Sequence, residues 1–186
     1  MADENWISYA EFGSAFFEHA VTEERILRAL TGIAGEPIEF GPIGAGPGRL
    51  ARVRAHGELG EASAQRLPSD LVCFRLTIPV SLRLDVDLGV DQHHFDADLL
   101  VGLTLTARAA APLRVVIDIE PPHGKDVSVE VVASSRRGTL LQMIAGVDRE
   151  IARFVARYVA REIDKPHVRG ARDIDVAARI DGAWGT

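Results

Sequence analysis

The centre of the chain alternates strictly between apolar and polar residues, and this pattern constrains the fold more than any other feature. Between positions 72 and 88 every even residue is apolar and every odd residue is polar or small. A helix does not sustain a period of two over 17 residues, so the run predicts one long β-strand with a single apolar face. Its apolar members are Val72, Phe74, Leu76, Ile78, Val80, Leu82, Leu84, Val86 and Leu88.

A second alternating run follows after a short GVDQH segment, with the opposite parity. Its apolar members are Phe95, Ala97, Leu99, Val101, Leu103, Leu105 and Ala107, and Leu100 is the one exception. The two runs predict a long antiparallel hairpin, for which a register pairing residue 83 with residue 98 is one solution. Runs at 113–119 and 127–133 predict two further strands. Pro79, in the middle of the first run, indicates an edge position or a bulge that bends the sheet.

Helical periodicity flanks this strand-rich centre. A helix in one or two pieces is predicted from about Phe12 to Ile33, with Thr22 as an N-cap, and a 25-residue helix is predicted over 139–163. Four arginines spaced i, i+4 follow one face of the second helix: Arg149, Arg153, Arg157 and Arg161. The glycine-rich segment 41–48 is predicted to be a loop before a short strand at 51–56, and the pattern of 173–183 leaves strand and helix open.

These elements predict one α+β domain over residues 1–186, with residues 1–11 as a loose N-terminal segment. Its core would be a long, curled antiparallel β-sheet. An N-terminal helix and a long C-terminal helix would pack on the apolar face of that sheet.

Composition narrows the functional classes. The formal net charge of −6 argues against a nucleic-acid partner, because phosphate binding needs a concentrated basic surface. Apolar stretches fall short of the roughly 20 residues that a membrane-spanning helix needs, and the first residues, MADENWISYAEF, lack the basic and apolar regions of a secretory signal. Cys73 is the single cysteine, which excludes an intrachain disulfide. We therefore expect a cytoplasmic protein without a transmembrane segment.

Catalytic and metal-binding motifs are weak in this sequence. His94, Asp96 and Asp98 share the polar face of one predicted strand and are the only metal-ligand candidates that we single out. A solvated face that keeps the sheet soluble explains them better. The glycine-rich loop lacks the spacing of a phosphate-binding motif, and no serine has the context of a nucleophile elbow. The sequence thus predicts no metal and no cofactor, and it favours a non-catalytic protein over an enzyme.

The apolar face of the sheet is the main candidate binding surface. If the helices leave it incompletely filled, an acyl chain or another apolar ligand would lie there; if they fill it, the face is simply core. The candidate ligand-binding residues are Phe74, Leu76, Ile78, Val80, Leu82, Leu84, Val101, Leu103, Leu105, Ile144, Ile151 and Val155.

The layout resembles the tubular lipid-binding (TULIP) superfamily. The resemblance covers roughly Thr22 to Ile180 and rests on the order of the elements and the length of the strands. It implies a hydrophobic tube between the sheet and the long helix that holds lipid tails, with no cofactor and no catalysis. On this basis the chain is expected to be a cytoplasmic lipid carrier or sensor, a monomer or a homodimer.

Two other functions stay open at this point. One is a small-molecule enzyme of a biosynthetic pathway, with a cavity between sheet and helix. The other is a structural or assembly protein that buries the apolar face in an oligomer. An enzyme needs at least two ionisable groups that point into the cavity, whereas a lipid carrier needs an aliphatic lining.

Overall fold

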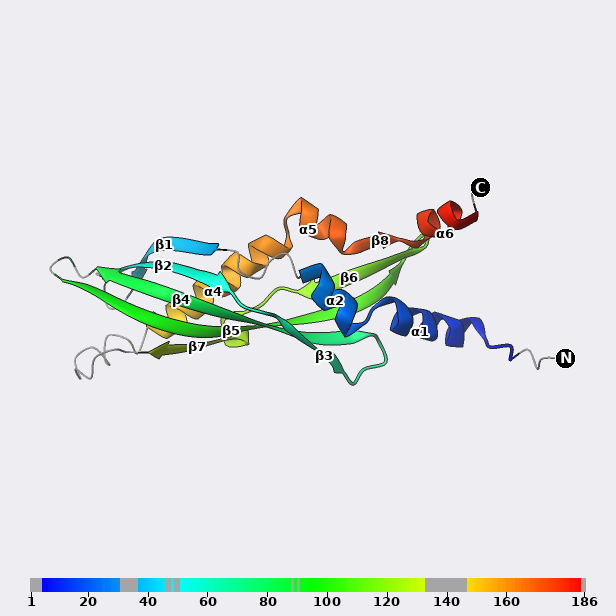
Figure 1. Cartoon of the computed structure of the whole chain (residues 1–186), viewed down its shortest axis with the longest axis horizontal. Coiled ribbons are helices and arrows are strands. Elements are labelled where there is room, and N and C mark those ends of the chain that lie inside the picture. Colours follow the sequence, from blue (N-terminus) through cyan, green and yellow to red (C-terminus); the bar gives the residue numbers. More distant parts are fainter. Residues whose placement is uncertain are drawn as a thin grey trace.

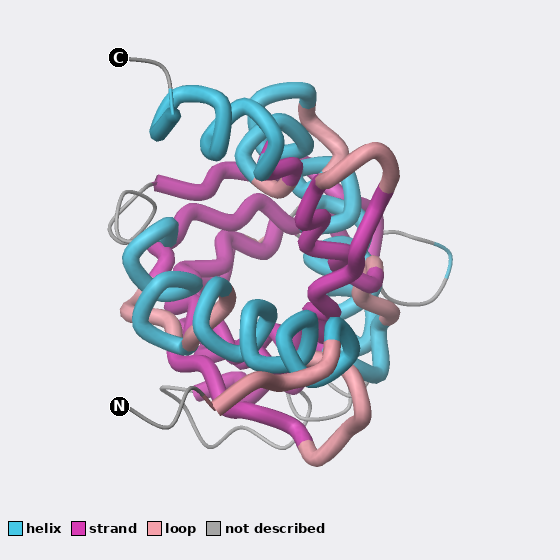
Figure 2. Tube along the Cα trace, turned by 90° about the vertical axis from the view of Figure 1, so that its right-hand side faces the viewer, coloured by secondary structure: helices cyan, strands magenta, loops and turns pink. Residues whose placement is uncertain are grey.

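The computed structural model describes residues 5–30, 37–45, 48, 51–87, 89, 91–132 and 147–184. An eight-stranded antiparallel sheet curls along the long axis of the molecule, and helices cover its inner side (Figures 1 and 2). The predicted α+β fold with a curled antiparallel sheet is confirmed. The helices are α1 (Tyr9–Ala20), α2 (Glu23–Leu30), η2 (Gly124–Asp126), α4 (Val147–Ile163), α5 (Pro166–Ala171) and α6 (Val176–Trp184). The strands are β1 (Pro37–Ala45), β2 (Ala51–Leu59), β3 (Ser63–Leu67), β4 (Cys73–Asp87), β5 (Gln92–Ala110), β6 (Arg114–Glu120), β7 (Val127–Val132) and β8 (Asp173–Asp175).

The long β4–β5 hairpin forms the middle of the sheet, and shorter strands pair with its two halves. At one end, β2 pairs with β4, β1 pairs with β2, and β7 pairs with β5. At the other end, β3 pairs with β4, β6 pairs with β5, and β8 pairs with β6. We call these the α4 half and the α2 half, after the helix that covers each.

The alternation in β4 and β5 is a burial pattern, as predicted. The even residues of β4 and the odd residues of β5 from Phe95 to Ala107 are buried, and the residues between them are exposed or half-buried. The register differs from the one we considered, because Arg83 lies opposite Asp96 rather than Asp98. The reason is a short turn: Asp87 pairs with Gln92, and the Asp87 carboxylate accepts a hydrogen bond of 2.8 Å from the Gly89 N–H. A shift of two residues keeps every side chain on its predicted face.

Pro79 lies where the strand beside β4 is interrupted. Leu59 is paired with Val80 and Ser63 with Thr77, so residues 60–62 bulge out opposite Pro79. The Gly60 N–H donates to the Pro79 carbonyl over 2.8 Å. The N and O atoms of a residue in an antiparallel strand point to the same side. The nitrogen of Pro79, which has no hydrogen to donate, therefore faces the interruption as well, and no hydrogen bond of a regular strand pair is lost there. β4 itself has no bulge, because its register with β5 continues through Pro79 opposite Leu100; Pro79 instead lies at a local gap in the neighbouring strand, which resembles the predicted edge position.

The glycine-rich segment predicted to be a loop is mostly strand. Residues 37–45 form β1, which pairs with β2 in two stretches separated by a bulge between Phe40 and Ile43. Gly41 adopts a φ of 114° in this bulge, and a Cβ there would lie 2.6 Å from the Val53 carbonyl oxygen. Only glycine tolerates both conditions, so the Gly-Pro pair marks a bulge and not the end of the strand.

The N-terminal helix is in two pieces and begins earlier than expected. Residues 9–11, assigned to a loose segment, form the first turn of α1, because Ser8 and Glu11 make a capping box. Hydrogen bonds from the Ser8 N–H and hydroxyl hold the pKa of the Glu11 carboxyl below its usual value, so the contact persists at neutral pH and is lost as the pH falls through that lowered pKa. Thr22 caps α2 as predicted, with Oγ1 accepting from the Arg25 N–H over 3.3 Å.

The C-terminal helix is shorter in the described residues than predicted. α4 has 17 residues, and the predicted part at 139–146, including Ile144, lies outside the described residues. α5, β8 and α6 follow, so 173–183 contains both a strand and a helix. Within the described ranges, no helix has the length and hydropathy needed to cross a bilayer.

α4 packs into the curl of the sheet through one side and leaves its arginines outside. Ile151 and Val155 are buried, and the Phe154 ring stacks on that of Phe40 with centroids 4.4 Å apart. The helix also lies against β7 and η2. It therefore spans from β1 to β7, the two edges of its half of the sheet. The four arginines of the i, i+4 row are all exposed on the other side.

Gly57 provides a test of how closely β2 and β4 approach. A Cβ at this position would lie 2.2 Å from the Ser81 carbonyl oxygen, so Gly57→Ala should lower the free energy of unfolding by about 1–3 kcal/mol. Gly13 in α1 has no atom within 4 Å of such a Cβ, so Gly13→Ala should be neutral or stabilising by up to about 1 kcal/mol. Urea unfolding of both variants measures the difference, and equal stabilities would contradict the close packing.

Candidate functional site

The predicted ligand-binding residues form one continuous apolar surface inside the curl. Ile144 lies outside the described residues, and the others are all buried within the main hydrophobic cluster. We call this surface the inner face. Its predicted members are Phe74, Leu76, Ile78, Val80, Leu82, Leu84, Val101, Leu103, Leu105, Ile151 and Val155.

The inner face is chemically uniform. Among the residues that the structure describes, no polar or charged residue is buried. Each strand contributes aliphatic side chains at alternate positions, with Phe74 and Phe95 as the buried aromatic residues of the central hairpin. A surface of this kind offers dispersion contacts and excludes water, but it provides no hydrogen bond for a polar substrate.

The two halves of the inner face are covered to different extents. In the α4 half, the helix buries Ile151, Ala152, Val155 and Ala156 against the sheet. In the α2 half, α1 buries no residue and α2 buries only Ile26, and the break between these helices adds Val21. The N-terminal helices therefore contribute fewer fully buried residues than α4, since their other core contacts come from side chains that are only partly buried: Phe16, Phe17, Ala20, Leu27 and Leu30. Their attachment is the weaker of the two on this ground.

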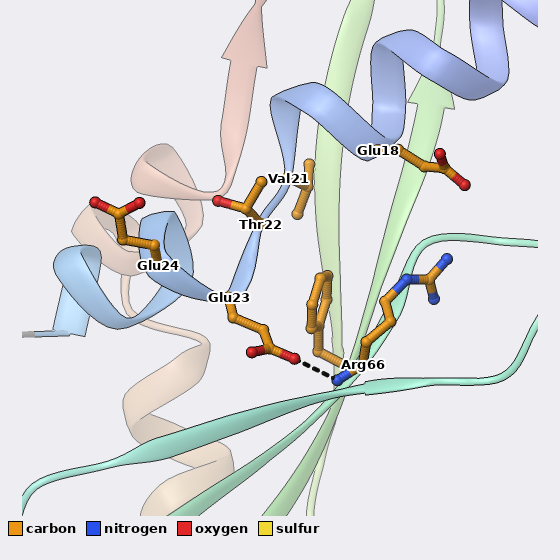
Figure 3. A pocket seen from close by; sticks show the side chains of 7 residues that line it. Glu18, Val21, Thr22, Glu23, Glu24 and Arg66 are labelled. Atoms are coloured by element: carbon orange, nitrogen blue, oxygen red, sulfur yellow. Dashed lines mark hydrogen bonds between the residues drawn. The ribbon is translucent and has the colours of Figure 1, made fainter.

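An open cavity of about 550 Å³ lies where α1 and α2 meet the sheet (Figure 3). Val21 and Phe74, both members of the core, form its apolar floor. Glu18, Glu23 and Glu24 project from the helices on one side, and Arg66 projects from β3 on the other. The cavity thus joins the apolar core to a polar, mainly acidic rim.

Arg66 anchors the strand at this rim. Its Nη1 donates to the carbonyl oxygens of Leu67, Leu71 and Cys73 over 2.9, 3.0 and 3.0 Å, and its guanidinium carbon lies 5.6 Å from the centre of the Phe74 ring. The Arg66 N–H donates to the Glu23 carboxylate over 2.8 Å, which ties α2 to β3. Sequence reasoning missed this residue, since nothing in the polar segment 57–70 distinguished it from a solvated arginine.

The three candidate metal ligands lie on the outer face of β5, each beside a different residue of β4. His94 Nδ1 is 2.6 Å from Asp85 Oδ1, Asp96 is 3.6 Å from the Arg83 Nε, and Asp98 accepts from the Ser81 hydroxyl over 2.9 Å. The alternation predicted their common face, but the ladder separates them along the strand. The described part of the chain contains no group of three or more His, Cys, Asp or Glu residues placed to hold a metal ion.

Comparison with known protein families finds no match to the chain, and comparison with curated proteins finds no similar sequence. Arguments about its function therefore rest on its own geometry.

The Arg66 contacts predict an unequal response to two lysine substitutions. The nitrogen of a lysine lies one bond nearer the backbone than Nη1 and lacks the planar guanidinium that lies over the Phe74 ring, so it does not reach all three carbonyl oxygens, and Arg66→Lys should lower the free energy of unfolding by about 1–3 kcal/mol. Arg83→Lys is the matched control, because the Arg83 side chain is 74% exposed and its ion pair is worth little, within about 0.5 kcal/mol. Denaturant titration followed by circular dichroism tests the pair. A loss at Arg83 as large as that at Arg66 would refute the anchoring role.

Proposed function

We propose that this chain binds a lipid or another apolar ligand, without catalysis, between the curled sheet and the helices that cover it. The observation that carries the proposal is the inner face, which runs along the 15 residues of β4 and the 19 residues of β5 with no buried polar residue in the described chain. A surface of this length and uniformity suits an acyl chain, which needs continuous apolar contact and no directional bonds.

Entry on the α2 side is supported by the weak cover there. Displacing α2 would remove Ile26 and the nearby Val21 from the core, whereas displacing α4 would expose five buried residues and separate Phe154 from Phe40. The α2 half also carries the open cavity, with Phe74 in its floor. We therefore propose that the ligand enters beside α2 and lies along Leu76, Leu103 and Leu105, while α4 keeps the other half closed.

The resemblance to tubular lipid-binding proteins agrees with this proposal, since it also puts an apolar ligand between a curled sheet and helices. The enzymatic alternative requires ionisable groups directed at the ligand, and in the described residues such groups lie on the outer face or at the rim of the cavity. We place the proposed carrier in the cytoplasm, where a chain with one cysteine and no disulfide is stable.

The affinity of the protein for fatty acids should depend on chain length. Native mass spectrometry of the purified protein should detect co-purified lipid, and unlabelled fatty acids should displace a fluorescent fatty acid. Each added CH₂ group that is buried contributes about 0.8 kcal/mol, so affinity should rise roughly fourfold per carbon until the groove is full. Protein without bound lipid that takes up no probe, or an affinity independent of chain length, would sink the proposal.

A matched pair of alanines tests the location of the ligand. Ala107 is buried on the inner face, so Ala107→Leu should occupy space needed by the ligand and shorten the preferred chain by about two to four carbons. Ala109, two residues further along β5, is exposed, and Ala109→Leu should leave the preference unchanged. Thermal unfolding of both variants confirms that each is folded. Identical chain-length profiles for the two variants would place the ligand elsewhere.

A further inference from the structure

One end of the molecule exposes an unusual number of large apolar side chains. α1, the β5–β6 turn and α6 lie at the same end of the long axis (Figure 1). The exposed residues on these segments, on the strand β8 and just before α1 define what we call the apolar end: Trp6, Ile7, Tyr9, Phe12, Leu113, Ile174 and Ile180. Monomeric proteins rarely expose such a concentration unless it contacts something.

α1 is the clearest part of this surface. It has 12 residues, none of them buried, and Tyr9 and Phe12 are 98% and 60% exposed. The Phe12 ring stacks on that of Phe16 with centroids 6.5 Å apart, and Phe16 itself packs half-buried against the core. The C-terminal part of α1 is thus held by the core, whereas Tyr9 and Phe12 in its N-terminal part have their apolar surface exposed to solvent.

The charges at the apolar end indicate what that partner is. The two arginines that flank the β5–β6 turn are neutralised, because Arg108 lies 2.9 Å from Asp118 and Arg114 lies 3.0 Å from Asp173. α1 adds two carboxylates, Glu11 and Glu18, and one histidine, His19, and α6 adds Arg179 and Asp181, so these segments carry no excess of lysine and arginine. Charges of this kind are not attracted to an anionic surface and are compatible with a neutral one. The exposed arginines of α4 lie in the opposite half of the molecule, where the other side of that helix packs against β7.

We infer that the apolar end, including Tyr9 and Phe12 of α1, docks on a lipid bilayer whose headgroups carry no net charge. Tryptophan and tyrosine prefer that environment, because one part of the side chain is apolar and another forms hydrogen bonds. The inference rests on the proposed function, since docking there brings the cavity floored by Val21 and Phe74 close to the source of its ligand. Acidic lipids oppose the contact, because the polar side of α1 is itself acidic.

Tryptophan fluorescence with vesicles tests this docking. The chain has two tryptophans, so the Trp184→Phe variant reports on Trp6 alone. Vesicles of pure phosphatidylcholine should shift the emission of Trp6 to shorter wavelength and should co-sediment the protein. Replacing two of the aromatic side chains, in Tyr9→Ser/Phe12→Ser, should weaken vesicle binding at least roughly tenfold. Adding phosphatidylglycerol to the vesicles should leave the binding unchanged or weaker.

The matched control is Leu100→Ser, which removes another exposed apolar side chain, from the outer face in the middle of β5. This variant should bind phosphatidylcholine vesicles like the unmodified protein, and both sets of variants should unfold at the same temperature as the parent. Equal losses in Leu100→Ser and in the double variant would overturn the inference.

Three further results would also overturn it. The first is no binding to phosphatidylcholine vesicles at all. The second is binding that requires phosphatidylglycerol and is lost in Arg157→Gln, which would assign the contact to α4. The third is a dimer in sedimentation that the double variant abolishes while vesicles stay unbound, which would assign the apolar end to a second copy of the chain.

The docking and the proposed function can fail separately. Displacement of the fluorescent fatty acid is measured without vesicles and reports only on the inner face, whereas co-sedimentation reports only on the apolar end. A protein that takes up fatty acid but ignores vesicles keeps the proposed function and loses the docking. A protein that binds vesicles but takes up no fatty acid supports the docking surface and refutes the proposed ligand of the inner face.

Discussion

The pairing of β4 with β5 is the interaction on which the rest of this structure depends. All 15 residues of β4 are in register with β5, from Cys73 opposite Thr106 to Asp87 opposite Gln92. Every other strand joins the sheet through this hairpin or through a strand that pairs with it. Because side chains alternate between faces, one continuous ladder sets the direction of the whole apolar surface. The helices then cover a surface whose position the hairpin has already determined.

Much of the sheet could be predicted because burial repeats with the period of the strand. The alternation identified β4, β5 and their inner residues, and Pro79 indicated a position where the pairing on one side of β4 is interrupted. The exact register depends on the turn, where Asp87 and Gly89 make a local contact that hydrophobicity does not encode. β1 was missed because its glycines and proline resemble a loop until Val53 is seen to lie against Gly41.

The residues of the candidate site also fall into a group that the sequence predicts and a group that it does not. Its apolar residues follow from the alternation, since a residue on the inner face is identified by parity alone. Arg66 and the cavity beside it could not be predicted, because they depend on where α2 meets β3 and on carbonyl groups that any residue could present. Parity also gave the common face of His94, Asp96 and Asp98, but it could not give the different β4 residue beside each of them, because parity does not determine the neighbour on the next strand.

The interruption opposite Pro79 has a consequence for how such a chain can change in evolution. β2 and β3 each pair with β4 separately, so neither depends on the length of the connection between them. Extra residues between Glu61 and Ala62 would enlarge a bulge at the surface and leave both registers intact. One extra residue inside β4 would instead turn half of its apolar side chains to the solvent. New segments can therefore be acquired at this bulge while the central hairpin stays constant in length.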